Sequence, residues 1–239
     1  MKSFAQVLVT AFVLVFAASG LNATIKPPKG HYKKAYDASM VLYGSSVSDK
    51  RENHPMCSAT VFRKVQGGYL LLSAGHCAIT GGLNEFPADL TYSASSDIGT
   101  PIYPIKLLKA VCNEETNVDF SVFFFPTTLK FPVIELGDEG SEQIGNKTYN
   151  FNFSKEITKL LSRGVIVSLP VTTGPTKNLV FVDQFAALGS SGSSVISEKT
   201  NRIIGIVTYG WQILEKMPEG FIPISAVKLE LSKTNDLPK

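Results

Sequence analysis

Short segments with the character of β-strands, separated by turn residues, follow one another along most of this chain. Their spacing is typical of an all-β protein, and a helix is expected only at residues 226–232. Residues 126–141 are rich in turn residues and are predicted to connect two groups of strands. The predicted strands cover residues 40–43, 58–64, 69–73, 102–109 and 119–125, and then 148–153, 164–169, 179–183, 194–197, 203–208 and 220–223.

The composition fits one globular unit. Among 239 residues, 44% are hydrophobic and 18% are charged, which is enough apolar material for a sizeable core. The net charge of +3 is too small to argue for nucleic acid or an anionic membrane as a partner. The three cysteines and three histidines are scattered without zinc-ligand spacing, so we expect neither a metal nor a cofactor.

The amino terminus predicts export. Met1 and Lys2 are followed by an apolar stretch at 4–18 and then by small and polar residues through Ala23. This apolar stretch is short for a membrane span, which needs about 20 residues. We therefore expect a signal peptide at 1–23, with an uncleaved anchor as the alternative, and a secreted or periplasmic mature chain at 24–239 without stable membrane insertion.

A glycine-flanked serine is the first candidate for chemistry. Ser191 lies in the segment Gly189-Ser190-Ser191-Gly192. A tight turn of this kind can direct the backbone N–H groups of Gly189 and Ser191 toward one point, which an oxyanion hole requires. Clusters of glycine and serine are also ordinary loop material, so this segment alone could be a linker.

His76 is the candidate base for this serine. It follows the apolar run 69–72, and small residues precede it while Cys77 follows it. The other histidines, His31 and His54, lie in polar stretches and have the character of surface residues. A lone histidine is more often structural than catalytic, but that alternative accounts poorly for the residues around His76.

Asp119 is the candidate partner of this histidine. It begins a strand that becomes fully apolar through Phe125. An unpaired buried charge is costly, and a histidine N–H is a suitable partner for it. In a serine hydrolase such a carboxylate orients the imidazole and stabilises its protonated form. Taken alone, Asp119 is more often a turn or strand-start aspartate, but His76 and Ser191 favour the catalytic interpretation.

At this point the chain resembles the chymotrypsin-like (trypsin-like) serine peptidases, and among them the bacterial HtrA-type branch, without a PDZ domain. The resemblance covers about residues 35–228, with histidine, aspartate and serine in the family's order. It implies two packed six-stranded β-barrels, at about 36–126 and 142–224, with the active site in the cleft between them. The matching segments are residues 57–62, 73–77, 118–122, 189–195, 204–210 and 220–224.

The resemblance also implies roles for individual residues. His76 would be the general base, Asp119 its orienting partner and Ser191 the nucleophile, with Gly189 and Ser191 supplying the oxyanion-hole N–H groups. A polypeptide substrate would pair with the strand at Thr208, Tyr209 and Gly210. Phe185 would form the base of the specificity pocket, and because no acid lies there we expect cleavage after small or apolar residues. A disulfide would join Cys57 to Cys77, which leaves Cys112 outside it.

Two departures from the family pattern keep a second hypothesis open. Ser190 replaces the aspartate that receives a new amino terminus in most digestive members, so activation by that route is not expected. Ser194 stands where proline is common, which leaves the loop after Ser191 less rigid. The chain is therefore predicted to be a secreted serine endopeptidase, and the alternative is a weak or inactive peptidase-fold protein with a binding or structural role.

Overall fold

The computed structural model describes residues 28–48, 50–78, 89–113, 115–138, 140–153, 158–170, 172–174, 176–209, 219–233 and 237–238. The predicted signal peptide at 1–23 and the predicted site residue Gly210 lie outside these residues. Within the described segments, no helix has the length and apolar character needed to cross a membrane.

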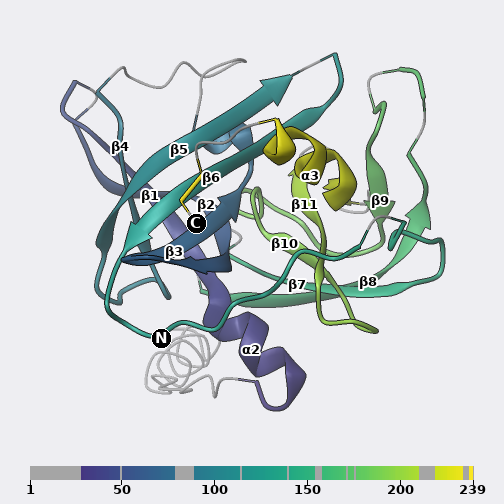
Figure 1. Ribbon diagram of the computed structural model, residues 1–239, viewed down its shortest axis with the longest axis horizontal. Helices are drawn as coiled ribbons and strands as arrows, with labels where there is room; N and C mark the ends of the chain where they lie inside the picture. Colours follow the sequence, from purple (N-terminus) through teal and green to yellow (C-terminus); the bar gives the residue numbers. More distant parts are fainter. Residues whose placement is uncertain are drawn as a thin grey trace, which may run out of the picture.

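In the described residues, twelve strands form two closed antiparallel barrels, which lie side by side in Figure 1. The first has the order β1-β2-β3-β6-β5-β4 and the second the order β10-β11-β12-β9-β8-β7. This confirms the predicted all-β fold of two six-stranded barrels with a short carboxy-terminal helix. The strands are β1 (Ser39–Ser46), β2 (Arg51–Val65), β3 (Gly68–Ser73), β4 (Thr91–Ser95), β5 (Tyr103–Asn113), β6 (Val118–Pro126), β7 (Lys147–Asn152), β8 (Leu160–Ser168), β9 (Val180–Val182), β10 (Ser194–Ser197), β11 (Ile203–Tyr209) and β12 (Glu219–Pro223), and the helices are α2 (His31–Ala38), η1 (Gly75–Cys77) and α3 (Ile224–Ser232).

The largest hydrophobic cluster extends through both barrels, and a separate buried cluster lies within the second barrel. Leu70 and Phe123 from the first barrel belong to the same buried cluster as Tyr149 and Ile206 from the second. Val227 of α3 joins this cluster, so the carboxy-terminal helix covers the junction of the barrels. Because apolar burial is the main stabilising term in folding, this shared cluster holds the two barrels in a defined relation.

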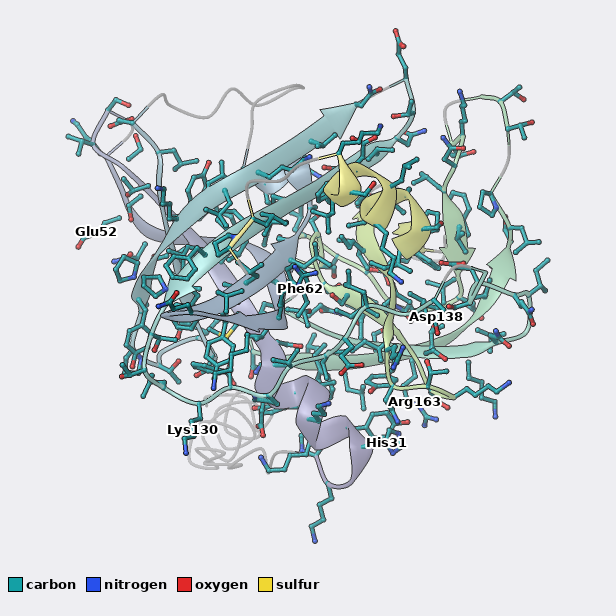
Figure 2. The ribbon with its side chains drawn as sticks, viewed as in Figure 1. His31, Glu52, Phe62, Lys130, Asp138 and Arg163 are labelled. Carbon is teal, nitrogen blue, oxygen red and sulfur yellow. A yellow bond between two sulfur atoms is a disulfide. The ribbon has the colours of Figure 1, made fainter. Side chains whose placement is uncertain are left out.

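Side chains divide between this interior and the surface as expected. Phe62 is 3% exposed and lies near the middle of the molecule in Figure 2, whereas Glu52, Lys130 and Arg163 project outward. The strand segments follow the same rule, because all six residues of β3 are buried. Strand β3 therefore reads as a continuous apolar run, which is the feature that made it predictable.

Two elements were not predicted from the sequence. Strand β4 is serine-rich and contains no long apolar run, and it becomes a strand by pairing with both β1 and β5 as it closes the first barrel. Helix α2 has no side-chain cap at its start and buries only Ala35 and Ala38. It docks through Tyr32 and Tyr36, whose rings lie 4.8 Å and 5.4 Å from those of Tyr149 and Phe151. Tertiary contacts rather than local signals therefore form these two elements.

Candidate active site

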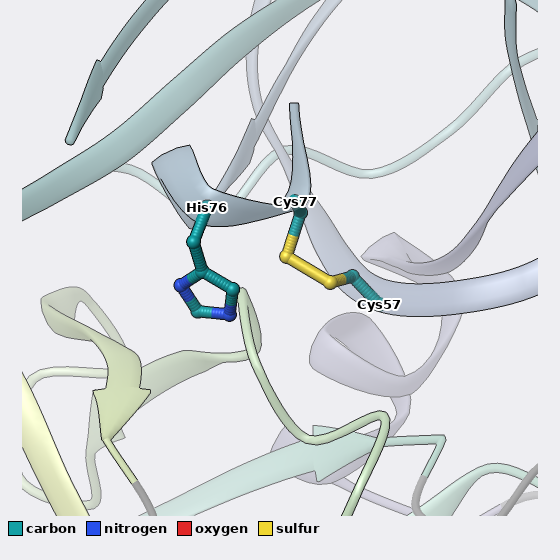
Figure 3. Close-up of side chains that lie close together, drawn as sticks. All are labelled: Cys57, His76 and Cys77. Carbon is teal, nitrogen blue, oxygen red and sulfur yellow. A yellow bond between two sulfur atoms is a disulfide. The ribbon is translucent and has the colours of Figure 1, made fainter. Parts of the chain in front are cut away.

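His76 lies on a short helical turn at the end of β3. The turn η1 packs so closely against β5 and β6 that a Cβ at Gly75 would overlap the carbonyl oxygen of Val111 and Oδ1 of Asp119. A disulfide joins Cys77 to Cys57 on β2, with the two Cα atoms 6.3 Å apart (Figure 3). The predicted disulfide is therefore present, and it ties the histidine turn to the barrel wall.

Asp119 binds His76 through both of its carboxylate oxygens. Oδ2 lies 2.5 Å from Nδ1 of the His76 ring, and Oδ1 accepts a 2.7 Å hydrogen bond from the His76 backbone N–H. The aspartate side chain is 13% exposed and the histidine side chain 38% exposed. The carboxylate thus fixes both the backbone and the ring of His76, and it leaves Nε2 as the ring nitrogen directed to a second partner.

The loop that carries Ser191 has an alternating pattern of backbone hydrogen bonds. Ser190 N–H donates to the Ala187 carbonyl at 2.9 Å, and Gly192 N–H donates to the Val207 carbonyl at 2.8 Å. Within the part of the chain that the structure describes, the N–H groups of Gly189 and Ser191 donate to no protein acceptor. Gly189 and Gly192 have φ of 91° and 83°, a conformation that glycine adopts without steric cost. The loop therefore presents two unused N–H donors on either side of Ser190.

This loop is seated directly on the first barrel, next to the histidine turn. The Ser191 carbonyl accepts a 2.8 Å hydrogen bond from Ser58 N–H on β2. A Cβ at Gly192 would overlap Ser73 Oγ and the Ser58 carbonyl oxygen, so the backbone approaches the end of β3 very closely. The structure thus joins His76 and Asp119 directly and sets the Ser191 loop against the strand that leads into His76. Among the described side chains, the Ser191 hydroxyl has no hydrogen bond to His76, a contact that often tightens only when substrate binds.

The predicted substrate-binding residues occupy two different settings. Thr208 is half-buried on β11, and the backbone of Tyr209 pairs with Gly220 of β12. Phe185 was expected at the base of a specificity pocket, but its side chain is 53% exposed. A side chain with that much solvent contact cannot be the floor of a closed pocket, so this expectation is corrected: Phe185 lies on the surface, where its backbone N–H donates to Ser162 Oγ at 2.9 Å.

A buried carboxyl group inside the second barrel was missed by sequence reasoning. Glu219, at the start of β12, is 1% exposed, and its Oε2 accepts hydrogen bonds from Gln184 Nε2 at 2.7 Å and Asn150 Nδ2 at 3.3 Å. Its Oε1 has no hydrogen-bond partner among the described residues. Burial raises the pKa of Glu219 to about 8, although both hydrogen bonds act to lower it.

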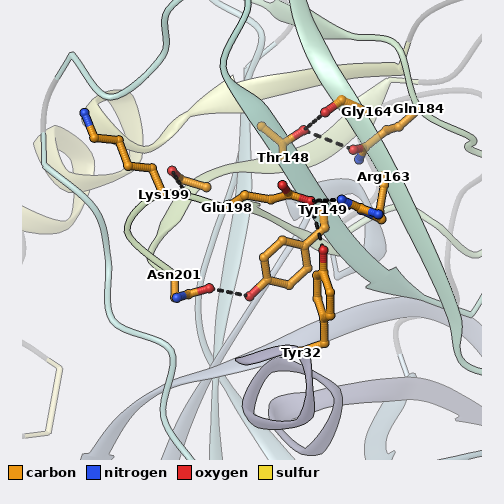
Figure 4. Close-up of polar contacts among 10 residues, drawn as sticks. Tyr32, Thr148, Tyr149, Arg163, Gly164, Gln184, Glu198, Lys199 and Asn201 are labelled. Carbon is orange, nitrogen blue, oxygen red and sulfur yellow. Dashed lines mark hydrogen bonds and ion pairs between the residues drawn. The ribbon is translucent and has the colours of Figure 1, made fainter. Parts of the chain in front are cut away.

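This carboxyl group belongs to a polar network that extends to the barrel wall. Thr148 Oγ1 lies 3.2 Å from Gln184 Oε1 and 3.5 Å from the Gly164 carbonyl oxygen (Figure 4). Figure 4 also shows Tyr32 and Arg163 meeting Glu198, which links α2 and β8 on the outside. A single glutamate before an apolar strand carries no signal in the sequence that it will be buried.

Metal-ligating side chains come together at one place in the described residues. Ligand atoms of Cys57, His76 and Cys77 all lie within 4.8 Å of one another. The sulfur atoms of Cys57 and Cys77 are bonded to each other in the disulfide, so neither is available as the thiolate that binds metal ions. We therefore assign this cluster to the histidine turn and not to a metal centre.

The two closed six-stranded barrels and the carboxy-terminal helix define the chymotrypsin-like fold. No protein-family model matches the chain, and no curated protein matches it. Solved structures of HtrA-type serine proteases do match in fold. They include HtrA-type protease AlgW with a decapeptide, with a TM-score of 0.65 and 17% identity over 84% of this chain and 66% of that one.

Two further structures give the same result. AlgW with a tripeptide has a TM-score of 0.64 and 16% identity over 84% of this chain and 62% of that chain. The serine endoprotease from Yersinia pestis has a TM-score of 0.62 and 17% identity over 87% of this chain and 67% of that one. About a third of each neighbour has no counterpart here. At this level of identity the likeness establishes the fold alone.

Proposed function

We propose that this chain is a secreted serine endopeptidase that hydrolyses peptide bonds through His76, Asp119 and Ser191. One observation carries the proposal. Asp119 holds His76 at both the ring and the backbone, beside a loop whose Gly189 and Ser191 N–H groups are left without protein acceptors. A binding protein has no need of either feature, whereas acyl transfer needs both.

The proposed reaction follows from the position of each group. Ser191 Oγ attacks the peptide carbonyl carbon while His76 Nε2 takes its proton, and Asp119 stabilises the resulting imidazolium. The carbonyl oxygen becomes an oxyanion, which the N–H groups of Gly189 and Ser191 stabilise. His76 then returns the proton to the leaving amine. Water attacks the acyl-enzyme by the same route and releases the acid.

A polypeptide is the proposed substrate. The neighbouring AlgW structures contain a decapeptide and a tripeptide, which supports a peptide ligand for the same fold. Residues 208–210 would receive the substrate backbone as an added strand. Because Phe185 lies on the surface, its identity no longer supports a preference for a small or apolar residue at the cleaved position.

Labelling with a fluorophosphonate probe tests this function. The purified mature protein should form a covalent adduct at Ser191, which peptide mapping by mass spectrometry locates. Ser191→Ala and His76→Ala should abolish labelling, and Asp119→Asn should slow it by about 10⁴-fold. His31→Ala is the matched control, because His31 is exposed on α2, and it should label at the wild-type rate. A folded wild-type protein that does not label would refute the enzyme and leave the binding or structural alternative.

A further inference from the structure

Ser58 is a fully buried residue of β2 that contacts the Ser191 loop in two ways. Its backbone N–H donates to the Ser191 carbonyl at 2.8 Å, and its hydroxyl donates to the Gly189 carbonyl at 2.7 Å. The same hydroxyl accepts a 3.1 Å hydrogen bond from Phe153 N–H at the end of β7. Ser58 therefore connects the first barrel to both residues that would supply the oxyanion-hole donors.

These two contacts restrict the peptide groups around Ser191. Because a peptide group is planar, a hydrogen bond at its carbonyl also orients the N–H of the following residue. The group between Gly189 and Ser190 is held by Ser58 Oγ at its carbonyl and by Ala187 at its N–H. The next group but one, between Ser191 and Gly192, is held by Ser58 N–H and by the Val207 carbonyl. The intervening group, which carries the Ser191 N–H, is thus fixed from both sides.

Ser58 is also the last member of a series of buried serine hydroxyls that joins the three proposed catalytic residues. Ser121, two residues after Asp119, donates to the Ala74 carbonyl at 2.7 Å, and Ala74 precedes the histidine turn. Ser73 donates to the Ser58 carbonyl at 2.7 Å. The histidine turn is therefore held to β6 and β2, and Ser58 extends this connection to the nucleophile loop.

We propose that Ser58 is a positioning residue for the oxyanion hole, acting through its hydroxyl on Gly189. This role rests on the proposed function. A buried serine could serve stability alone. Here, however, the Ser58 hydroxyl donates to the Gly189 carbonyl, and the Ser58 backbone N–H donates to the carbonyl of the proposed nucleophile, Ser191. Removing the hydroxyl leaves the Gly189–Ser190 peptide group with the Ala187 hydrogen bond alone, so the Gly189 and Ser191 N–H groups on either side of it are held less firmly in their common direction.

The rate of fluorophosphonate labelling at Ser191 measures this role. In that reaction Ser191 Oγ forms a bond to phosphorus, fluoride leaves and His76 takes the proton. Loss of one oxyanion donor costs about 10²- to 10³-fold in rate, and a misdirected donor should cost less. Ser58→Ala should therefore slow labelling by about 10- to 100-fold. The final labelled fraction and the pH dependence of the rate should match those of the wild type.

Ser39→Ala is the matched control. Ser39 is 1% exposed on β1, and its hydroxyl donates to the Ala35 carbonyl at 2.8 Å and not to the nucleophile loop. It should lower the melting temperature as Ser58→Ala does, yet label at the wild-type rate. If Ser58→Ala is recovered unfolded, Ser58→Gly removes the same hydroxyl and is judged by the same criterion.

The outcomes separate the two proposals. A folded Ser58→Ala protein that labels at the wild-type rate overturns the positioning role while the peptidase stands. A smaller labelled fraction at an unchanged rate constant also overturns it, because that pattern reports only lost native protein. A wild-type protein that does not label refutes the peptidase and with it the role of Ser58.

Discussion

At the scale of single residues, Gly192 shows how closely the nucleophile loop is fitted to the first barrel. Its φ of 83° would strain any other residue, and an added Cβ would overlap Ser73 Oγ and the Ser58 carbonyl oxygen. Conformational strain and steric overlap are therefore combined at this position. Other glycines in the described residues have one constraint or the other: Gly145 has a positive φ but no atom near an added Cβ, whereas Gly75 has close contacts without a positive φ.

We predict that Gly192→Ala is much more damaging than Gly145→Ala. Gly145 has a similar φ of 89°, but no atom lies within 4 Å of its added Cβ. Gly145→Ala should cost only the strain of a left-handed residue, about 1–2 kcal/mol of unfolding free energy. Gly192→Ala should cost about 1–3 kcal/mol more and should lose labelling at Ser191, because the loop must move off the barrel.

Urea unfolding and fluorophosphonate labelling of the two variants provide the measurement. Equal losses of stability, with normal labelling of Gly192→Ala, would contradict the close approach of the loop to β3.

At the scale of elements, the histidine turn depends on its attachment to β2. The disulfide between Cys57 and Cys77 closes a loop that spans 20 residues and contains the hairpin of β2 and β3. Such cross-links stabilise mainly by restricting the unfolded chain, by about 2–4 kcal/mol for loops of this length. The same cross-link keeps η1 beside the barrel wall, so stability and activity should respond together.

We predict that the double variant Cys57→Ala/Cys77→Ala loses about 2–4 kcal/mol of unfolding free energy and labels more slowly at Ser191. Denaturant unfolding and labelling rates measure the two effects. Cys112→Ala is the control, because it removes a cysteine of β5 that lies outside the disulfide. A double variant as stable as the control would refute the structural role of the bridge.

Elements with strong local signals could be predicted from the sequence, and those formed by distant contacts could not. Strand β3 has a continuous apolar run, and the Ser191 loop has its glycines, so both were found. Strand β4 has neither signal, and it is a strand because its backbone pairs with β1 on one side and β5 on the other. The same distinction applies within the site. Ser58 and Gly189 are 131 residues apart, and Gln184 and Glu219 are 35 apart, so no local pattern could show either contact.

At the scale of the whole molecule, we expect the two barrels to unfold as one cooperative unit. Their largest buried cluster contains residues of both barrels and of α3. Ser58 adds hydrogen bonds from the first barrel to the nucleophile loop of the second. Neither barrel can unfold without exposing apolar surface of the other, which is the condition for all-or-none unfolding.

We predict that slowly exchanging amide protons of β3 and β12 open with the same free energy. Hydrogen exchange followed by mass spectrometry at increasing urea concentrations gives this free energy for each strand. Strands of the same barrel, such as β3 and β6, provide the internal standard. A second barrel that opens at a distinctly lower free energy than the first would show two independent units.

In all-or-none unfolding, buried ionisable groups in different regions act on the same equilibrium. Burial raises the pKa of Glu219 to about 8, from 4.5 in an exposed chain. Burial lowers the pKa of Lys159 to about 8, from 10.5. Lys159 is 6% exposed, and its Nζ donates to the Tyr36 carbonyl at 2.6 Å. Glu219 lies inside the second barrel, whereas Lys159 joins that barrel to helix α2.

These two groups should give a minimum in stability near pH 8. Between pH 4.5 and about 8 the folded protein holds a proton on Glu219 that the unfolded chain has released, so the unfolding free energy falls as pH rises. Between about 8 and 10.5 the unfolded chain holds a proton on Lys159 that the folded protein has released, so the free energy rises again. Each group contributes a slope of at most about 1.4 kcal/mol per pH unit.

Urea unfolding from pH 4.5 to 10.5 tests this pH profile, and two variants show which group causes the fall in stability and which causes the rise. Glu219→Gln should remove the fall in unfolding free energy between pH 4.5 and about 8, and Lys159→Met should remove the rise between about 8 and 10.5. Each substitution removes the group whose proton is exchanged. Exposed Glu135 and Lys130 provide controls. Glu135→Gln and Lys130→Met remove the same charges from the surface, and both the fall and the rise in stability should remain. If the unfolding free energy of the wild type does not fall between pH 4.5 and about 8, the carboxyl group of Glu219 is ionised in the folded protein, and the second barrel must supply its Oε1 with a partner.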